Sequence, residues 1–391
     1  MKQLLTLLYS LATAFIAAAQ PGNDLSGIIV DSAQEAPLPG VTIYLNGTSK
    51  GAISGDDGRF TIHNIRPGRY DIVVSSIGHE TLVYPISGDN LPRNIKFILR
   101  PQPTELQAAI VQPWLKDGWE RYGQFFLDNF IGTTPNAAHC SIRNRNALRF
   151  YFYRNRLSVS AAEPLIIEND ALGYSIQYKL EQFISDYDHN MVVYFGYPLF
   201  HEMETTKSGR RRTWETNRRQ AYYGSIMHFM RLLYARDSSF QGFVLQRYSA
   251  ATNQEKCRVA EVYHPDSPVT KKTPPDSIAY WQRVLRQPDV VNVALPVSPA
   301  SLYAADTTRQ TSLLFSGRLN VVYIDRNAVP GNPATPARRV SGLRLITPAP
   351  VTIDVNGSYF PPQELLTDGA WGRSEKIANL LPVDYDPTTS N

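Results

Sequence analysis

Apolar and polar residues alternate in short runs near the start of the chain, and this alternation is typical of half-buried β-strands. The alternation is clearest over residues 41–45, and it recurs in other short runs at 60–62, 70–74 and 95–99, while residues 27–30 add a further short strand. Asn46-Gly47 and Pro67-Gly68 supply turns between these runs. About seven short strands within roughly 75 residues predict a small antiparallel β-sandwich.

The same residues carry specific motifs. The segments SGIIVD, PLPGV, NGTS, DDGRF and SSIGHE follow one another in this order between Gly27 and about Leu99. This order resembles the carboxypeptidase-regulatory-like family of transthyretin-like sandwiches. The resemblance implies a seven-stranded transthyretin/Ig-like β-sandwich over residues 24–101, serving as an accessory module of an exported Gram-negative envelope protein. It implies no peptidase activity, because the zinc site of the peptidases belongs to a different domain.

The DDGRF turn has two interpretations. Asp56 and Asp57 are residue types that bind cations. A turn between strands also favours Asp and Gly for backbone reasons alone, and we prefer this second interpretation.

Strands dominate beyond the sequence RPQPTELQ, which we interpret as a linker, and a few helices are predicted among them. A helix is predicted after Pro113, with an apolar stripe formed by Leu115, Trp119, Tyr122 and Phe126 at helical spacing. The stripe is either a ligand groove or a face that packs the helix onto a sheet, and we prefer the second interpretation. A second helix is predicted from about Trp214 to Tyr234, and a short one around 280–285. Strands are predicted at 148–152, 157–161, 174–181, 191–200, 240–248, 318–324 and 341–347, with the strand at 191–200 in the centre of its sheet.

The predicted fold class is therefore mainly β. The sandwich precedes a larger α+β, mostly antiparallel domain of unknown function over residues 103–391, with a sub-boundary expected near 264–275. Segments such as GQFFLDNFIGTTPNAAHCSIRN and KIANLLPVDY are similar to segments of uncharacterised exported proteins that carry the same module. This second resemblance implies architecture and no known activity.

The first residues resemble a secretory signal peptide. Lys2 gives a positive start, residues 4–18 are largely apolar, and small residues end at Ala19. We expect cleavage after Ala19, so that residues 1–19 are a signal peptide; the alternative is a retained N-terminal anchor. No transmembrane segment is expected after cleavage. The protein is then exported, to the periplasm, to the outer membrane as an associated protein, or out of the cell.

Composition narrows the partners. The net charge of +4 over 391 residues predicts no nucleic acid partner. Hydrophobic residues make up 43 % and aromatic residues 11 %, which is ample for packed cores. Cys140 and Cys257 are the two cysteines. They form either one disulfide, which export permits, or two separate buried thiols, which we prefer.

No complete catalytic motif is present, and we predict no catalytic residue, metal or cofactor. His201 and Glu204 fit H-x-x-E, but a strand would direct them to opposite faces, and His264 is the last histidine downstream. Cys140 follows His139, yet neighbours on a strand also face opposite ways. We interpret that cysteine as structural.

One charge feature exceeds the background. It is a candidate anion-binding cluster comprising Lys207, Arg210, Arg211, Arg212, Arg218 and Arg219. The cluster suits phosphate or lipopolysaccharide headgroups. It is equally compatible with a solvated turn and helix start, offset by Glu202, Glu204 and Glu215.

Two functions remain at this point. The first is a non-enzymatic envelope or secreted protein, in which the sandwich is an interaction or stabilising module for a β-rich domain that binds an envelope protein or a glycan. The alternative is a hydrolase of unfamiliar class within residues 103–391. A concave pocket with converging polar groups favours the enzyme, whereas an open aromatic or basic face favours the binding protein.

Overall fold

A computed structural model describes residues 23–102, 114–237, 239–266, 272–304, 311–325 and 338–388. The predicted signal peptide, residues 1–19, and most of the predicted linker lie outside these ranges. The chain forms two compact units. The first unit comprises Met1–Arg231, Asp354–Ser358 and Ser374–Asn391, and the second comprises Leu232–Ile353 and Tyr359–Arg373.

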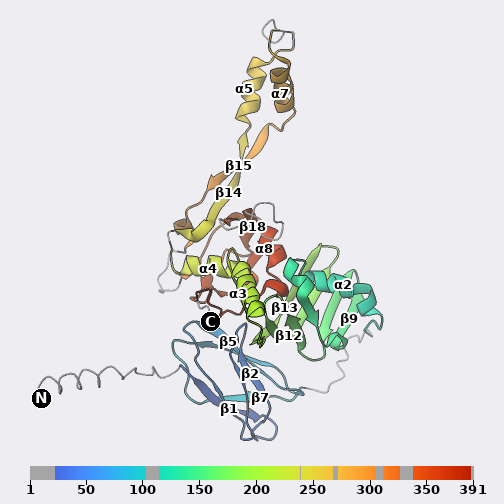
Figure 1. Ribbon diagram of the computed structural model, residues 1–391, viewed down its shortest axis with the longest axis vertical. Helices are drawn as coiled ribbons and strands as arrows, with labels where there is room; N and C mark the ends of the chain where they lie inside the picture. The colour runs from blue at the N-terminus through green and yellow to red at the C-terminus, as the bar shows by residue number, and fades with distance from the viewer. Residues whose placement is uncertain are drawn as a thin grey trace, which may run out of the picture. The chain divides into compact units, whose positions relative to one another are not determined.

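The first unit begins with a sandwich of two sheets, drawn in blue in Figure 1. The strands are β1 (Leu25–Asp31), β2 (Thr42–Leu45), β3 (Gly51–Ile53), β4 (Arg59–Ile62), β5 (Arg69–Ser75), β6 (Leu82–Ser87) and β7 (Ile95–Leu99). One sheet has the order β4–β1–β7 and the other β3–β2–β5–β6. Ile29, Ile43 and Ile72 are fully buried in the shared core. The seven-stranded sandwich predicted from the sequence is confirmed.

One strand pairing differs from the prediction of an antiparallel sandwich. β7 runs parallel to β1, with Gly27 opposite Ile95. Parallel neighbours need a crossover connection, and the strands of the other sheet, β2, β5 and β6, supply it here. An added Cβ at Gly27 would collide with the backbone oxygen of Ile95, so this close approach requires glycine.

Asp31, the last residue of β1, binds His79 in the loop between β5 and β6 and holds this loop in place. Its Oδ2 lies 3.0 Å from Nε2 of His79, and its Oδ1 accepts hydrogen bonds from the amides of Ala33 and Gln34. These contacts, the His79 bond first among them, lower the pKa of Asp31 below its ordinary value of 3.8. The ionised carboxylate is therefore the form that the fold stabilises.

A pH dependence follows from this lowered pKa. The stabilisation is present above the unfolded-state pKa of about 4 and is lost as the pH falls through the lower folded-state pKa. We expect Asp31→Asn to lower stability at pH 7 and to flatten the loss of stability below pH 4, measured by urea unfolding from pH 3 to 7. Asp56→Asn, in an exposed turn, is the control. An unchanged acid slope in Asp31→Asn would contradict the assignment.

The remainder of the first unit is a six-stranded antiparallel sheet with helices. Its strands are β8 (Cys140–Ile142), β9 (Leu148–Tyr153), β10 (Arg156–Ala161), β11 (Leu165–Asn169), β12 (Tyr174–Asp186) and β13 (Met191–Glu202). β12 is the central strand, because it pairs with β11, β10 and β13. The mostly antiparallel character of this region is confirmed.

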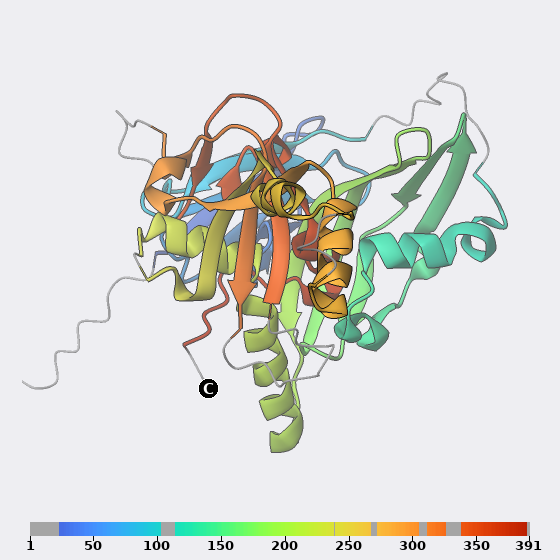
Figure 2. The same cartoon turned by 90° about the horizontal axis from the view of Figure 1, so that it is seen from above.

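Helix α2 (Gly118–Phe130) covers one face of this sheet. Phe126 and Phe130 are fully buried, with ring centroids 5.0 Å apart. Phe126 also contacts Phe150 of β9 and Phe183 of β12. Figure 2 shows the helix beside the green strands. The aromatic stripe therefore packs a helix onto a sheet, as preferred from the sequence.

The prediction of a central strand at 191–200 is wrong. β13 is an edge strand of its sheet, and among the described residues it pairs along its length with β12 alone. Met191 and Phe195 in its first half are exposed, whereas Leu199 in its second half is buried against Tyr44 of the sandwich. An isolated bridge between Thr48 and Leu199 joins the sandwich to this edge. The sandwich therefore covers apolar residues in the second half of the strand, whereas those of the first half remain exposed.

Two helices, α3 (Ser208–Tyr222) and α4 (Ile226–Tyr234), replace the single helix predicted from Trp214 to Tyr234. Gly224, with a φ of 81°, separates them. Helix α3 begins before the predicted start, so the consecutive arginines lie in its first turns rather than in a loop. Tyr222 of α3 and Phe229 of α4 are buried.

The second unit is also mostly antiparallel. It has one sheet of order β15–β14–β17–β18–β21 and another of order β16–β19–β20. The strands are β14 (Phe243–Thr252), β15 (Val290–Pro296), β16 (Thr311–Leu313), β17 (Leu319–Ile324), β18 (Arg338–Leu345), β19 (Val351–Ile353), β20 (Tyr359–Phe360) and β21 (Leu365–Asp368). Helix α8 (Gly369–Ser374) follows β21.

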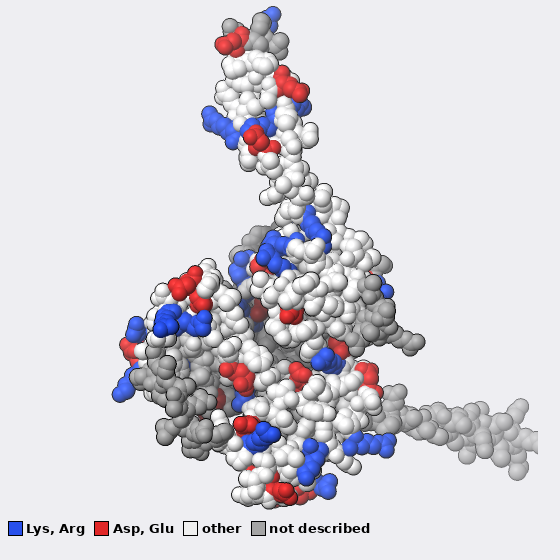
Figure 3. Space-filling model, turned by 180° about the vertical axis from the view of Figure 1, so that it is seen from behind, with Lys and Arg blue, Asp and Glu red and all other residues white. Residues whose placement is uncertain are grey.

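Strands β14 and β15 form a long hairpin that carries helices α5 (Gln254–Val262) and α7 (Pro275–Leu285), as Figure 1 shows. The hydroxyl of Tyr280 in α7 donates to Glu255 in α5 over 2.7 Å. Acidic and basic side chains are interspersed on this helical pair in Figure 3. The sub-boundary predicted near 264–275 falls in the connection between the two helices. That sub-boundary, like the one between residues 101 and 103, stays a prediction.

Of the helices in the described ranges, none is long and apolar enough to cross a membrane.

Candidate functional site

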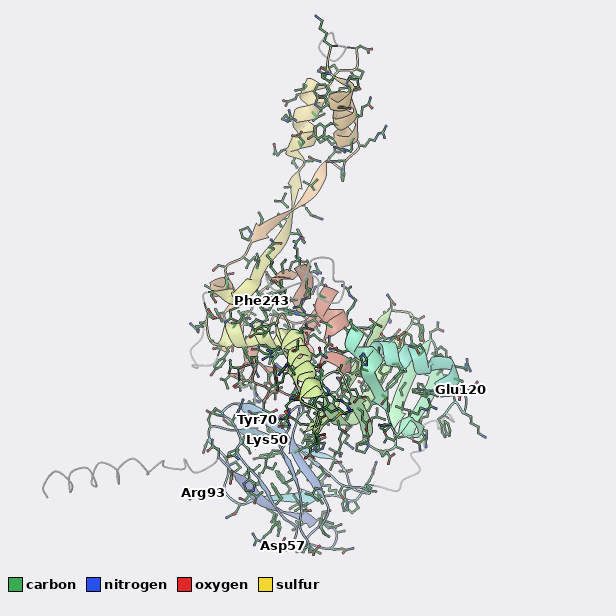
Figure 4. All side chains as sticks on the ribbon, viewed as in Figure 1. Lys50, Asp57, Tyr70, Arg93, Glu120 and Phe243 are labelled. Atoms are coloured by element: carbon green, nitrogen blue, oxygen red, sulfur yellow. The ribbon has the colours of Figure 1, made fainter. Side chains whose placement is uncertain are left out.

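A cavity of about 1180 Å³ lies within the first unit. We call it the polar pocket. Its walls come from the sandwich, the end of β13, helix α3 and the C-terminal segment, which we define as residues 377–388. The lining residues are Ser49, Lys50, Arg66, Tyr174, residues 202–207, Arg210, Arg211, Trp214, Glu215, Arg218, Pro382 and residues 384–386. Figure 4 labels Lys50 at the end of the sandwich nearest α3 and Asp57 at the opposite end.

Charged side chains of both signs converge in the polar pocket. The basic ones are Lys50, Arg66, Lys207, Arg210, Arg211 and Arg218, and the acidic ones are Glu202, Glu204, Glu215, Asp384 and Asp386. This lining suits a ligand that carries negative charge together with groups that donate hydrogen bonds to carboxylates.

The structure places four residues of the predicted anion-binding cluster in this pocket: Lys207, Arg210, Arg211 and Arg218. Arg212 and Arg219 belong to the same helix but are not among the lining residues. Lys207 and Arg211 are exposed. The guanidinium of Arg211 donates a long hydrogen bond, of 3.5 Å, to the carbonyl of Thr205.

Trp214 explains why α3 starts where it does. The helix has no acidic residue in its first turn and no side-chain cap, so local sequence opposes its start. The buried indole of Trp214 donates to the carbonyl of Asp170 over 2.8 Å. Arg210 lies over the indole ring and pairs with the Asp170 carboxylate at 2.8 Å. Tertiary anchoring therefore outweighs the local preference.

Arg218 is held in one orientation at the wall of the pocket. Its guanidinium lies 3.9 Å from the ring centroid of Tyr174. It donates to the carbonyls of Leu172 and Gly173 over 2.7 and 3.1 Å, and to the Glu202 carboxylate over 3.2 Å. Only 11 % of the side chain is exposed. Such bonding fixes the plane of the guanidinium before any ligand arrives.

Sequence reasoning missed the wall that the sandwich supplies. Lys50 and Arg66 are more than a hundred residues from the basic cluster, and the fold alone brings them to it. Arg66 donates to the carbonyl of Asp384 over 3.1 Å and lies 4.0 Å from the Asp386 carboxylate. The Asn46-Gly47 turn identified a loop near Lys50, but it carries no information about what that loop contacts.

The C-terminal segment was also missed, and Arg231 is its main anchor. The three nitrogens of this guanidinium donate to the carbonyls of Asn356, Tyr385 and Val383, each over 3.0 Å. The amide of Val383 donates to the carbonyl of Gly47 over 2.7 Å. The segment therefore runs between the sandwich and α4 and forms one wall of the pocket.

The phenols at the pocket stay neutral. Burial raises the pKa of Tyr385 to about 12, although the nearby guanidiniums of Arg219 and Arg218 oppose the rise. Burial likewise raises the pKa of Tyr174. Both side chains therefore act as aromatic surfaces and neutral hydrogen-bonding groups, and the positive charges on the pocket wall are not neutralised by phenolate.

The residues weighed for catalysis belong to different parts of the chain. His201 lies in β13, Glu204 lies in the loop after it, and His264 belongs to the second unit. Within the described parts of the chain, no three His, Cys, Asp or Glu side chains are close enough to hold a metal ion.

Both cysteines are free. Cys140 is partly buried, and desolvation raises the pKa of its thiol to about 12. Cys257 is exposed, which corrects the expectation of two buried thiols. It lies on the short, largely solvated helix α5, where only Val259 is buried.

Comparison with known proteins identifies the N-terminal module. Residues 25–111 match the family model described as CarboxypepD_reg-like domain. The chain thus carries a CarboxypepD_reg-like domain, as its motifs indicated. No curated protein matches the chain.

Solved structures give only faint likenesses. A DUF3823 family protein from Bacteroides ovatus ATCC 8483 shares 10 % identity, with a TM-score of 0.17, over 47 % of this chain and 83 % of its own. A Bacteroides fragilis NCTC 9343 protein of unknown function, described as membrane-associated, shares 10 % identity over 85 % and 94 % of the two chains, with a TM-score of 0.16. Fervidolysin from Fervidobacterium pennivorans shares 14 % identity over 48 % and 30 %, with a TM-score of 0.17. Scores this low carry no argument about this chain.

Proposed function

We propose that this chain is an exported envelope or secreted protein that binds an anionic ligand in the polar pocket. One observation carries the proposal. Basic side chains from the CarboxypepD_reg-like domain, Lys50 and Arg66, line the same cavity as four basic side chains of the region 207–218. The module then acts as one wall of a binding site as well as a stabilising domain.

The acidic lining favours binding over catalysis. Three of the five carboxylates are already engaged by the protein. Glu202 pairs with Arg218, Asp384 accepts a 2.6 Å hydrogen bond from the hydroxyl of Ser49, and Asp386 lies 4.0 Å from Arg66. Carboxylates held in this way organise the walls of a site and are poor candidates for proton transfer.

A hydrolase of unfamiliar class remains the second candidate, because several polar groups converge in a concave pocket. Glu204 and Glu215 are the two carboxylates for which a catalytic role would be tested, by release of reducing ends from envelope glycans. Activity that both Glu204→Gln and Glu215→Gln abolish would favour the hydrolase.

Binding to envelope material tests the first candidate. We expect the protein to sediment with outer-membrane vesicles at 50 mM salt and to be released at 500 mM, since exposed charge interactions are screened at high ionic strength. The double variant Lys207→Gln/Arg211→Gln should sediment several-fold less.

The matched control is Lys96→Gln/Arg93→Gln. It removes the same two charges from exposed positions of the sandwich outside the pocket. Equal losses in the two double variants would mean that net charge, and not the pocket, drives association. No sedimentation at low salt would reject an envelope ligand.

A further inference from the structure

We propose that the polar pocket takes a phosphate group borne on a sugar, with Arg218 as the residue that selects the oxyanion. This inference rests on the proposed binding function and names the ligand class. Three features of the pocket carry it: a guanidinium with unused donors, flexible cations on separate walls, and an abundance of hydroxyl and carboxylate groups.

Arg218 supplies a preorganised oxyanion fork. A guanidinium has five N–H groups, and the bonds to Leu172, Gly173 and Glu202 use three of them. Two N–H groups remain without a partner among the described residues, on a plane fixed by stacking on Tyr174. Donors held in one fixed plane match the oxygens of a phosphate better than a single mobile ammonium does.

Lys50 and Lys207 add mobile charge from opposite parts of the chain. Lys50 belongs to the sandwich and Lys207 precedes α3, and both line the pocket. The ammonium groups of both lack a partner among the described residues. Two such cations beside Arg218 favour a phosphate over a single carboxylate, because a phosphate presents more oxygens to several separate donors at once.

The remaining lining favours a hydroxyl-rich body for the ligand. Glu204 and Glu215 accept hydrogen bonds, and Ser49, Thr205 and Thr206 both donate and accept them. The aromatic rings give little apolar surface, because Arg210 covers Trp214 and Arg218 covers Tyr174. A sugar satisfies these acceptors, whereas an apolar chain leaves them unpaired.

Titration calorimetry on the full chain tests the inference with three probes: glucose 1-phosphate, glucose and inorganic phosphate. We expect glucose 1-phosphate to bind at least about tenfold more tightly than either of the others, since charge-assisted and neutral hydrogen bonds then act together. Arg218→Lys, which keeps the charge and loses the fork, should weaken it about tenfold.

Two further variants keep the test decisive if Arg218→Lys disturbs folding. Lys50→Gln/Lys207→Gln changes two ammonium groups that pair with none of the described residues, and it should weaken glucose 1-phosphate binding about fivefold or more. Arg93→Gln, exposed on the sandwich away from the pocket, should leave binding unchanged (Figure 4). Phosphatidylcholine vesicles with and without lipopolysaccharide then separate a soluble sugar phosphate from a lipid-borne headgroup.

Different results would contradict the sugar-phosphate inference and the proposed binding function. Equal binding of glucose and glucose 1-phosphate, unaffected by the lysine variants, overturns the phosphate assignment and leaves the pocket a binding site for another ligand. If inorganic phosphate binds as tightly as glucose 1-phosphate, the assignment of a sugar to the ligand is overturned. Absence of binding by every probe and by both kinds of vesicle overturns this inference and the proposed function together.

Discussion

Ending the chain after Lys376 is expected to abolish cooperative folding of the first unit. The residues removed include Ile377, Ala378 and Leu381, which are buried in the same core as Phe126 and Phe130. Each large aliphatic side chain contributes roughly 1.5–3 kcal/mol through burial. The truncation also strips hydrogen-bond partners from Asn169, whose buried side-chain amide donates to the carbonyl of Ala378 over 3.0 Å.

Arg231 loses two of its three acceptors in the same truncation. Each buried donor left unpaired costs about 1–3 kcal/mol, so the total approaches the whole stability of a typical domain, about 5–15 kcal/mol. Calorimetric unfolding of the full and shortened chains measures the effect. A chain ended after Thr388 is the control, because it keeps all of these contacts. A truncated chain that melts like the control would show that the C-terminal segment is dispensable.

Gly173→Ala is expected to destabilise the first unit by about 2–5 kcal/mol and to deform the polar pocket. Gly173 has a φ of 70°, which disfavours residues with a Cβ. An added Cβ would overlap the indole of Trp214. The carbonyl of Gly173 also accepts hydrogen bonds from Arg218 and from the amide of Met203. One methyl group thus disturbs the turn, the indole and the guanidinium together.

Gly209→Ala is the matched control for this substitution. It lies in the first turn of α3, where an added Cβ meets nothing within 4 Å, and alanine is favoured over glycine in a helix by about 1 kcal/mol. Gly173→Ala should lower the thermal unfolding temperature and abolish ligand binding. Gly209→Ala should leave both unchanged or raise the unfolding temperature slightly. A Gly173→Ala protein as stable as the wild type would contradict the packing of Trp214 described above.

The sandwich was predictable because its information is local. Turn residues at 46–47, 55–58 and 67–68 and the alternation in most of the strands specify it over short stretches of sequence. The parallel pairing of β1 with β7 was not predictable, because alternation gives no strand direction. The edge position of β13 could not be predicted either, for a related reason. Its second half is apolar towards a partner, the sandwich, that lies more than a hundred residues away in sequence.

The residues of the candidate site also fall into two groups, those that local sequence could identify and those that only tertiary structure brings together. The basic cluster is visible in the sequence because its members lie within residues 207–219. Which of them face a cavity depends on Trp214 and Asp170, and Lys50, Arg66 and Asp384 join them through tertiary structure alone. The first turn of α3 lacks an acidic residue and a side-chain cap, which disfavours a helix start there. The arginines were therefore predicted to lie in a turn before the helix.

Hydrogen exchange of the full chain, with and without lipopolysaccharide, tests the central claim most directly. The claim is that one pocket, built jointly by the CarboxypepD_reg-like domain, α3 and the C-terminal segment, holds the ligand. We predict slower exchange in residues 47–50, 202–218 and 382–386, and unchanged exchange around Asp57 and Arg93. Protection confined to other segments, or no protection at saturating lipopolysaccharide, would contradict the claim.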